Sequence, residues 1–208
     1  RKLYLANQDR IAQQVQHRES SEFKKDKLKV LAELTKLRQI CCDPRLHYED
    51  YKAGSAKLDT CMELVHGALD GGHRILLFSQ FTGMLDIIGK RLAKEDIAFL
   101  KLTGASSKES RAKMVAQFQA GKVPIFLISL KAGGVGLNLT AADVVIHYDP
   151  WWNVAAQDQA TDRAHRIGQQ HAVTVYKLIA KDTIEERIMQ MQESKRDLVN
   201  SVLGGDGI

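Results

Sequence analysis

The sequence predicts an α/β fold in which an open, doubly wound, mostly parallel sheet follows an N-terminal helical appendage. Five short apolar runs lie between residues 74 and 180, and each is continuous in apolar character rather than alternating. Such runs are typical of strands that helices cover on both faces of a parallel sheet. Amphipathic helical patterns separate most of the runs, which favours the α/β class over an all-β one.

The first quarter of the chain differs in texture from the rest. Residues 1–21 are polar and poorly periodic, whereas 23–41 carry apolar side chains near helical spacing with lysines between them: Leu28, Leu31, Leu34, Leu37 and Cys41. Asp43, Pro44 and the polar stretch YEDYKAGS end this predicted helix. We therefore predict a basic helical segment over 1–55, a main lobe over 56–192, and a helix end with a flexible tail over 193–208.

Within the main lobe, strands and helices follow one another along the chain. The predicted strands are 74–79, 98–103, 124–129, 143–149 and 173–180, and the predicted helices are 56–72, 84–95, 107–121, 154–167 and 183–199. Open α/β sheets bind ligands outside the carboxyl ends of their strands. The loops that follow Ser79, Thr103, Ser129 and Asp149 are therefore the candidate sites.

Composition restricts the class of protein. The net charge is +5, and residues 1–52 hold 12 Lys and Arg against 8 Asp and Glu, so +4 of it lies in the appendage, which favours a polyanionic partner. No apolar run approaches the roughly 18 residues of a membrane span, and no signal-peptide core opens the chain. Three cysteines without CxxC spacing favour idle thiols over a metal site. We expect an intracellular protein with no membrane partner, and a start at Arg1 suggests an excised fragment.

Two loops have a composition suited to phosphate, although each also has a simpler interpretation. LKAGGVGLNL follows a predicted strand, and its glycines let backbone amides approach a phosphate or sugar, or simply let the chain bend sharply. Its spacing is wrong for a GxGxxG dinucleotide site. In TGASSKESR, Ser106 or Ser107 caps a helix, and that helix start either holds a phosphate beside Gly104 or is an ordinary capping box.

The stretch QATDRAHRIGQQ concentrates charge on one side of a predicted helix. Winding residues 153–167 at the helical period places small apolar side chains on one stripe: Ala156, Ala160, Ala164 and Ile167. Gln159, Arg163 and Arg166 fall together on its flank, away from Asp158 and Asp162. Adjacent guanidinium groups without a carboxylate favour a highly charged anion as ligand. The alternative is that two solvated surface arginines coincide.

Four segments together resemble a known family. ILLFSQF, LTGASSKESRAKMVAQF, ISLKAGGVGLNLTAADVVIHYDPWWN and QATDRAHRIGQ, in this order, are similar to motifs IV, V and VI of superfamily-two helicases in the version of Swi/Snf-type DNA translocases. The resemblance covers about residues 28–190 and implies a RecA-like second lobe. In that family ATP lies between two lobes, and the first lobe supplies the phosphate-binding loop and the acidic Mg²⁺ motif. This chain has no GxxxxGK[ST], so we expect the first lobe to be absent and the fragment alone to be inactive.

The resemblance implies a role for individual residues. Arg163 and Arg166 match arginine fingers that reach the γ-phosphate of ATP, Gln159 matches a residue that orients them, and Gly134 and Gly136 match positions near the nucleotide sugar. The implied DNA-phosphate ligands are Gln80, Gly104, Ser107, Ser129 and Lys131. Trp152 resembles a tryptophan that abuts the duplex. For Trp151, a role in packing alone is as good an interpretation as a contact with DNA. We expect the His165 side chain to form a structural hydrogen bond.

The implied function is a motor lobe that grips the backbone of double-stranded DNA and remodels protein–DNA complexes. Its partners would be DNA, a first RecA-like lobe of the same protein and DNA-bound proteins, and its location the nucleus in a eukaryote or the cytoplasm or nucleoid in a bacterium. An RNA helicase lobe is a weaker alternative, because Gln169 stands where those proteins usually carry another arginine. A non-catalytic domain whose arginines bind an acidic protein is the alternative from another class.

Overall fold

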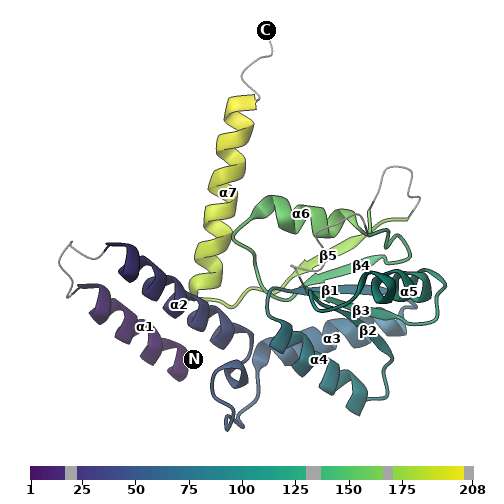
Figure 1. Ribbon diagram of the computed structural model, residues 1–208, viewed down its shortest axis with the longest axis horizontal. Helices are drawn as coiled ribbons and strands as arrows, with labels where there is room; N and C mark the ends of the chain where they lie inside the picture. Colours follow the sequence, from purple (N-terminus) through teal and green to yellow (C-terminus); the bar gives the residue numbers. More distant parts are fainter. Residues whose placement is uncertain (17–22, 130–136, 166–170, 204–208) are drawn as a thin grey trace.

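The computed structural model describes residues 1–16, 23–129, 137–165 and 171–203 (Figure 1). Its centre is a five-stranded sheet in the order β2-β3-β1-β4-β5, and every pairing is parallel. The strands are β1 Ile75–Ser79, β2 Phe99–Leu102, β3 Ile125–Ser129, β4 Val144–His147 and β5 Thr174–Lys177. All five lie inside the predicted apolar runs, so the predicted α/β class is confirmed.

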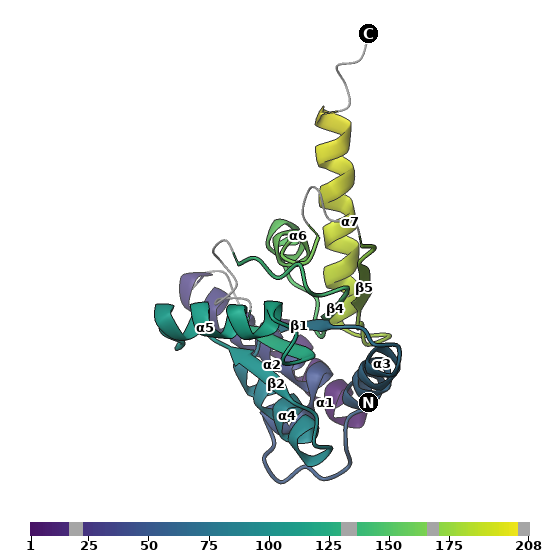
Figure 2. The same ribbon diagram turned by 90° about the vertical axis from the view of Figure 1, so that its right-hand side faces the viewer.

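Helices cover both faces of the sheet, as the continuous apolar runs require (Figure 2). Helices α3 (Ala56–Asp70) and α4 (Thr82–Lys94) pack on one face against alternate strand residues such as Leu77 and Leu127. Helices α5 (Lys108–Gln119) and α6 (Val154–Asp162) pack on the other face, against Phe78, Phe126 and their neighbours. The core therefore consists of two apolar layers on either side of β1, β3 and β4.

Strand β5 departs from the expectation of burial on both faces. It forms the edge of the sheet, and Val175 and Tyr176 are 37% and 38% exposed. The predicted run VTVYKLIA was longer than the strand, which covers only Thr174–Lys177.

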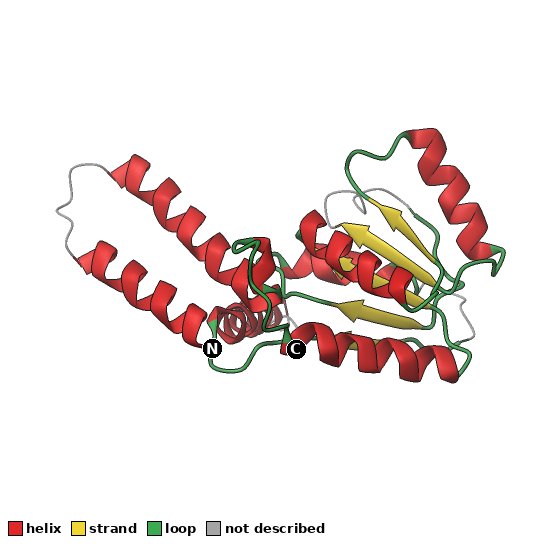
Figure 3. Cartoon of the chain, turned by 90° about the horizontal axis from the view of Figure 1, so that it is seen from below, coloured by secondary structure: helices red, strands yellow, loops and turns green. Residues whose placement is uncertain are grey.

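The appendage is a pair of helices side by side rather than one helix. Helices α1 (Lys2–Gln16) and α2 (Phe23–Cys42) contact each other and extend away from the sheet (Figure 3), and the short 3₁₀ helix η2 (Pro44–Leu46) follows them. Residues 1–21 are polar and poorly periodic, so the sequence predicted them only as part of a basic helical segment over 1–55. The buried face of α1 nonetheless repeats at helical spacing, through Tyr4, Asn7 and Ile11. Because one of these three is an asparagine, whose amide donates to the Tyr48 hydroxyl at 3.0 Å, the apolar pattern was hidden.

The amphipathic face predicted for α2 is only partly buried. Leu37 is 4% exposed and packs with Tyr4 and Ile40, whereas Leu28 and Leu31 are 70% and 49% exposed. The burial of α2 is therefore concentrated in the half next to the lobe.

Helix α7 (Ile184–Leu203) starts against the appendage and then projects from the body of the molecule (Figures 1 and 2). Ile184 and Ile188 pack with the buried side chains of α1 and α2. The buried Glu185 forms an ion pair with Lys57 of α3, so α7 is tied to the lobe as well. The predicted boundary at residue 193 falls inside this continuous helix. None of the helices in the described ranges is long and apolar enough to span a membrane.

Candidate nucleic-acid interface

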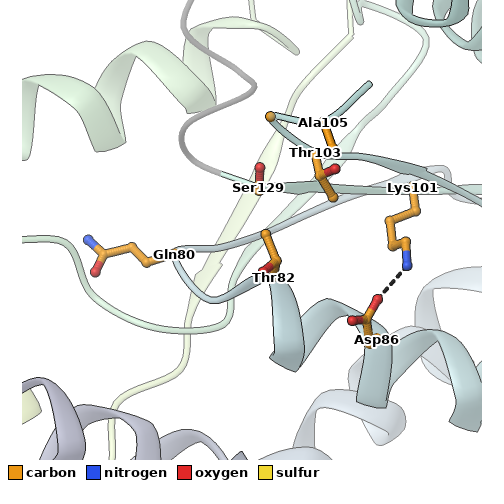
Figure 4. A pocket seen from close by; sticks show the side chains of 8 residues that line it. Gln80, Thr82, Asp86, Lys101, Thr103, Ala105 and Ser129 are labelled. Carbon is orange, nitrogen blue, oxygen red and sulfur yellow. Dashed lines mark hydrogen bonds and ion pairs between the residues drawn. The ribbon is translucent and has the colours of Figure 1, made fainter. Parts of the chain in front are cut away.

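A pocket of about 420 Å³ lies where the carboxyl ends of β1, β2 and β3 meet the start of α4 (Figure 4). The residues that line it are Gln80, Thr82, Asp86, Lys101, Thr103, Gly104, Ala105 and Ser129. Three of the five residues expected to hold DNA phosphates, Gln80, Gly104 and Ser129, thus line a single pocket although they come from three separate loops. Parallel strands bring them together because their carboxyl ends meet at one edge of the sheet.

Ser129 at the end of β3 is the most informative residue of the pocket. It pairs in register with Ser79 of β1, and both side chains are buried. The Ser79 hydroxyl donates to the carboxylate of Asp149, whereas the Ser129 hydroxyl has no hydrogen-bond partner among the described residues. A buried hydroxyl without a partner costs about 1–3 kcal/mol, so its retention beside a pocket is typical of a group that binds a ligand.

Two helix N-termini are close to the pocket. Helix α4 begins at Thr82, and its N-cap residue Phe81 offers no side-chain hydrogen bond to the first-turn amides. Helix α5 begins at Lys108, and the Ser107 hydroxyl accepts from the Ser110 N–H at 3.1 Å. Helix N-termini carry a partial positive charge and favour anions. The uncapped start of α4 is the better anion site, because Thr82 lines the pocket and Ser107 does not.

The sequence left open whether Ser106 or Ser107 caps helix α5, and the structure gives the two side chains different partners. Ser107 is the N-cap of α5, while the Ser106 hydroxyl accepts from the Thr103 N–H at 3.2 Å. The capping interpretation of TGASSKESR is therefore correct for Ser107, and its hydroxyl keeps one O–H donor for another partner.

Gly104 leaves space in the pocket wall. A methyl group built on its backbone would meet nothing within 4 Å. Packing within the chain therefore does not require glycine at this position, and the free space admits a ligand backbone.

The charged residues that line the pocket are one cation and one anion. Lys101 of β2 forms an ion pair with Asp86 of α4 (Figure 4). Both side chains are partly exposed, so this pair contributes little to stability.

A second cluster adjoins the pocket at Gln80, and the sequence analysis did not identify its central residue. Arg38 of α2 is 7% exposed, and its guanidinium donates to the side-chain oxygen of Gln80 and, at 3.3 Å, to the carbonyl of Pro150. It also lies 5.4 Å from the ring centre of Phe81 and 5.6 Å from that of Trp152. Burial lowers the pKa of Arg38, and the nearby carboxylate of Asp149 opposes that shift.

The two tryptophans have different environments. Trp151 is 1% exposed and packs edge-on against Phe78 and His147, so the packing interpretation holds for it. Trp152 is 36% exposed beside Arg38, which leaves it accessible to a large ligand.

Helix α6 positions the arginine expected to act on ATP. Asn153 caps its start, and Ala160 and Ala164 are buried on the predicted stripe, while Gln159 is exposed. The helix ends at Asp162, five residues before the predicted end, because the last turn tightens: the N–H of Arg163 donates to the Ala160 carbonyl, three residues back.

Several expected site residues cannot be placed. Arg166, Lys131, Gly134 and Gly136 lie outside the described residues, so the predicted pairing of two arginines stays a prediction. His165 is exposed, and its backbone N–H donates to the Thr161 carbonyl at 3.3 Å.

Buried glutamines that the sequence analysis did not identify join α6 to α7. Gln157 and Gln192 are 1% and 2% exposed. The Gln192 amide donates to the Trp151 carbonyl and, at 3.4 Å, to the side-chain oxygen of Gln157. Arg196 adds an ion pair to Asp158 at 2.8 Å. Helix α7 therefore supports the helix that leads to Arg163.

Comparison with known proteins agrees with this geometry. Residues 56–168, more than half of the chain, match the family model described as helicase conserved C-terminal domain. The SWI2/SNF2 ATPase core of Sulfolobus solfataricus, solved in complex with double-stranded DNA, superposes with a TM-score of 0.81 at 36% identity over 99% of this chain and 43% of that one. The chain is a helicase C-terminal lobe of the SWI2/SNF2 type. The expected family and RecA-like architecture are thereby confirmed.

Relatives of this SWI2/SNF2 lobe are much longer proteins. An uncharacterized ATP-dependent helicase of Mycoplasma pneumoniae is 42% identical over 99% of this chain and 20% of its own length. The human chromatin-remodeling ATPase INO80 is 47% identical over 64% of this chain and 9% of its own length. The chain thus spans about a fifth of the Mycoplasma relative and less of INO80.

Proposed function

We propose that this SWI2/SNF2 lobe is the second motor lobe of an ATP-dependent double-stranded DNA translocase that remodels protein–DNA complexes. The observation that carries the proposal is the strand-end pocket, in which Gln80 and Gly104 lie together with the Ser129 hydroxyl, which has no partner in the part of the chain that the structure describes. The Sulfolobus relative bound to double-stranded DNA and the relation to the chromatin-remodeling ATPase INO80 support the same function.

The pocket is suited to the phosphates of one DNA strand. Its uncapped helix start, amide side chain and free hydroxyl all donate hydrogen bonds, which a phosphate oxygen accepts. Lys131, two residues beyond Ser129, would add a positive charge. Contacts of this kind do not distinguish bases, so the lobe should bind all sequences about equally. Trp152, half-exposed beside the same edge, would abut the duplex.

The arginines of the QATDRAHRIGQQ stretch would act on ATP held by a first lobe. ATP supplies a phosphoryl group whose transfer spreads negative charge over its oxygens. Arg163 and Arg166 would stabilise that charge, an effect worth roughly 10³ to 10⁵ in rate, and Gln159 would orient them. Gly134 and Gly136 would lie near the sugar. Mg²⁺ would be held mainly by the first lobe, which supplies the acidic Mg²⁺ motif in proteins of the family that this chain resembles.

Movement along DNA would follow if each of the two lobes binds the DNA backbone. When ATP draws the lobes together and hydrolysis releases them, backbone grips on separate lobes move relative to each other. The result is stepping along one strand of the duplex without a need to separate the strands. This lobe alone would not hydrolyse ATP.

The test for the ATP role uses a protein in which this chain is joined to a first lobe. Arg163→Ala and Arg166→Ala should each abolish DNA-stimulated ATP hydrolysis while DNA binding persists, because the fingers act on the phosphoryl group and not on DNA. Lys177→Ala, which removes a positive charge of edge strand β5, is the matched control and should leave turnover unchanged. Unchanged turnover in both arginine variants would refute the role and leave the non-catalytic interaction domain as the better description.

The test for DNA binding combines Lys131→Glu with Ser129→Ala. Affinity should fall about equally on all sequences, and the dependence of affinity on salt should flatten, because one phosphate contact is lost. A loss confined to some sequences would contradict a backbone grip.

We also propose an intracellular location where DNA is present, namely the nucleus in a eukaryote or the cytoplasm or nucleoid in a bacterium, with DNA-bound proteins as further partners.

A further inference from the structure

Arg38 connects the helical appendage to the DNA pocket. It lies on α2, outside the region matched by the family model, yet its guanidinium contacts the side chain of Gln80, which lines the pocket. It is buried, it lies against the rings of Phe81 and Trp152, and it donates to the Pro150 carbonyl. Four contacts from two loops, those after β1 and β4, therefore hold one planar group.

The chemistry of this contact determines how the Gln80 amide must be oriented. A guanidinium has only donors, so it binds the oxygen of an amide and never its nitrogen. With the oxygen of Gln80 engaged by Arg38, the NH₂ group is the end that remains for a ligand. Figure 4 shows that this amide is at the tip of a side chain that extends from the end of β1.

We propose that Arg38 is a positioning residue that fixes the Gln80 amide with its two N–H donors available to a DNA phosphate. The inference rests on the proposed DNA-binding function and adds to it a residue of α2 and a reason for the amide. A phosphate oxygen only accepts hydrogen bonds, so an amide presented by its oxygen would repel it. A free glutamine would also lose side-chain freedom on binding, and Arg38 removes that cost beforehand.

The geometry also explains why the positioning group is buried between rings. The faces of Phe81 and Trp152 attract the cation and restrict its plane, and the Pro150 carbonyl takes a second hydrogen bond. An arginine held in this way keeps its charge within the protein and acts on DNA through Gln80. Its contribution to binding should therefore depend on residue 80.

The experiment is a double-mutant cycle on the 208-residue chain, with binding to a short fluorescent duplex measured by anisotropy. Arg38→Met, which keeps an unbranched apolar side chain and removes the donors, should weaken binding about 3- to 10-fold when residue 80 is glutamine, as expected for ordering one free side chain. In the Gln80→Ala background, Arg38→Met should change affinity less than about 2-fold. An equal loss in both backgrounds would overturn the proposal, because Arg38 would then act through charge or folding.

A second variant tests the inference without changing Arg38. In Gln80→Glu, Arg38 would engage one carboxylate oxygen and the other would face the phosphate, so affinity should fall below that of Gln80→Ala. Equal or tighter binding by Gln80→Glu would overturn the proposal. If Gln80→Ala and Ser129→Ala both bind DNA like the unchanged chain, the proposed DNA pocket itself fails. If they weaken binding but the cycle is additive, only the role of Arg38 fails.

Discussion

Replacing Ser129 with alanine should weaken DNA binding without a loss of stability. The Ser129 hydroxyl is buried at the end of β3 and has no hydrogen-bond partner among the described residues. A buried hydroxyl in that state costs about 1–3 kcal/mol, so its removal should leave the free energy of unfolding unchanged or raise it by about 1 kcal/mol. Most serine-to-alanine changes at partnered sites have the opposite sign.

Ser79 is a matched control, because it is the register partner of Ser129 on the neighbouring strand and is equally buried. Its hydroxyl donates to the carboxylate of Asp149, which also accepts from the Gln80 N–H at 3.1 Å. Because hydrogen bonds to charged groups contribute about 1.5–3 kcal/mol, Ser79→Ala should lower the free energy of unfolding by about that amount. Urea unfolding of the two variants compares them directly.

DNA affinity completes the comparison. If the Ser129 hydroxyl donates to a phosphate, its loss should cost about 1.5–3 kcal/mol, which is about 10-fold or more in the dissociation constant. The slope of affinity against salt should not change, because no charge is removed. The reasoning is refuted if Ser129→Ala unfolds as easily as Ser79→Ala and binds DNA as tightly as the unchanged chain.

Three further predictions concern single positions. Gly104→Ala should change the free energy of unfolding in urea by less than about 0.5 kcal/mol, since its methyl group meets no protein atom. It should weaken DNA binding, because the methyl group would crowd the phosphate. Unchanged affinity would contradict the placement of DNA there. Burial, with a contribution from the positive charge of Lys177, lowers the pKa of His147 to about 4. The neutral form therefore contributes stability that is complete above about pH 6.5 and declines by up to about 3 kcal/mol towards pH 4. The free energy of unfolding should depend less on pH across that range in His147→Gln. Lys57→Met leaves the buried carboxylate of Glu185 without its ion-pair partner and should lower the free energy of unfolding by about 3–5 kcal/mol at neutral pH. Part of the loss should be recovered in acid, because burial raises the pKa of Glu185. An unchanged free energy of unfolding would show that this ion pair does not hold α7.

Sequence reasoning succeeded where structure depends on local pattern. The strands could be predicted because a sheet covered on both faces requires continuous apolar runs, and β1 and β3 are buried at every residue. The loops that line the pocket could be predicted because parallel strands end at one edge, whereas the choice of Gln80, Gly104 and Ser129 within them came from the family resemblance. Neither inference needed knowledge of distant contacts.

The features that sequence reasoning missed depend on partners far apart in the chain. Helix α1 presents Asn7 to its buried face, where its amide donates to the Leu3 carbonyl one turn back and to the hydroxyl of Tyr48, which is distant in the chain. Arg38 looked like one of many basic residues of α2, because its partners lie at Gln80 and Pro150. The end of α6 could not be predicted either, since the carbonyl of Arg163 accepts a hydrogen bond from the N–H of Leu139, a residue that precedes β4.

That last hydrogen bond bears on how ATP and DNA would be coupled. Leu139 is buried, and its N–H lies 3.1 Å from the carbonyl of Arg163, the residue that would act on ATP. Leu139 lies in the described part of the connection between β3 and β4, so this hydrogen bond fastens that part to the end of α6. This hydrogen bond is costly to break, because the buried N–H of Leu139 would be left without a partner. Under the proposed mechanism, a movement of Arg163 towards a triphosphate would therefore shift Leu139 and the chain that leads into β4, the strand that precedes Trp152.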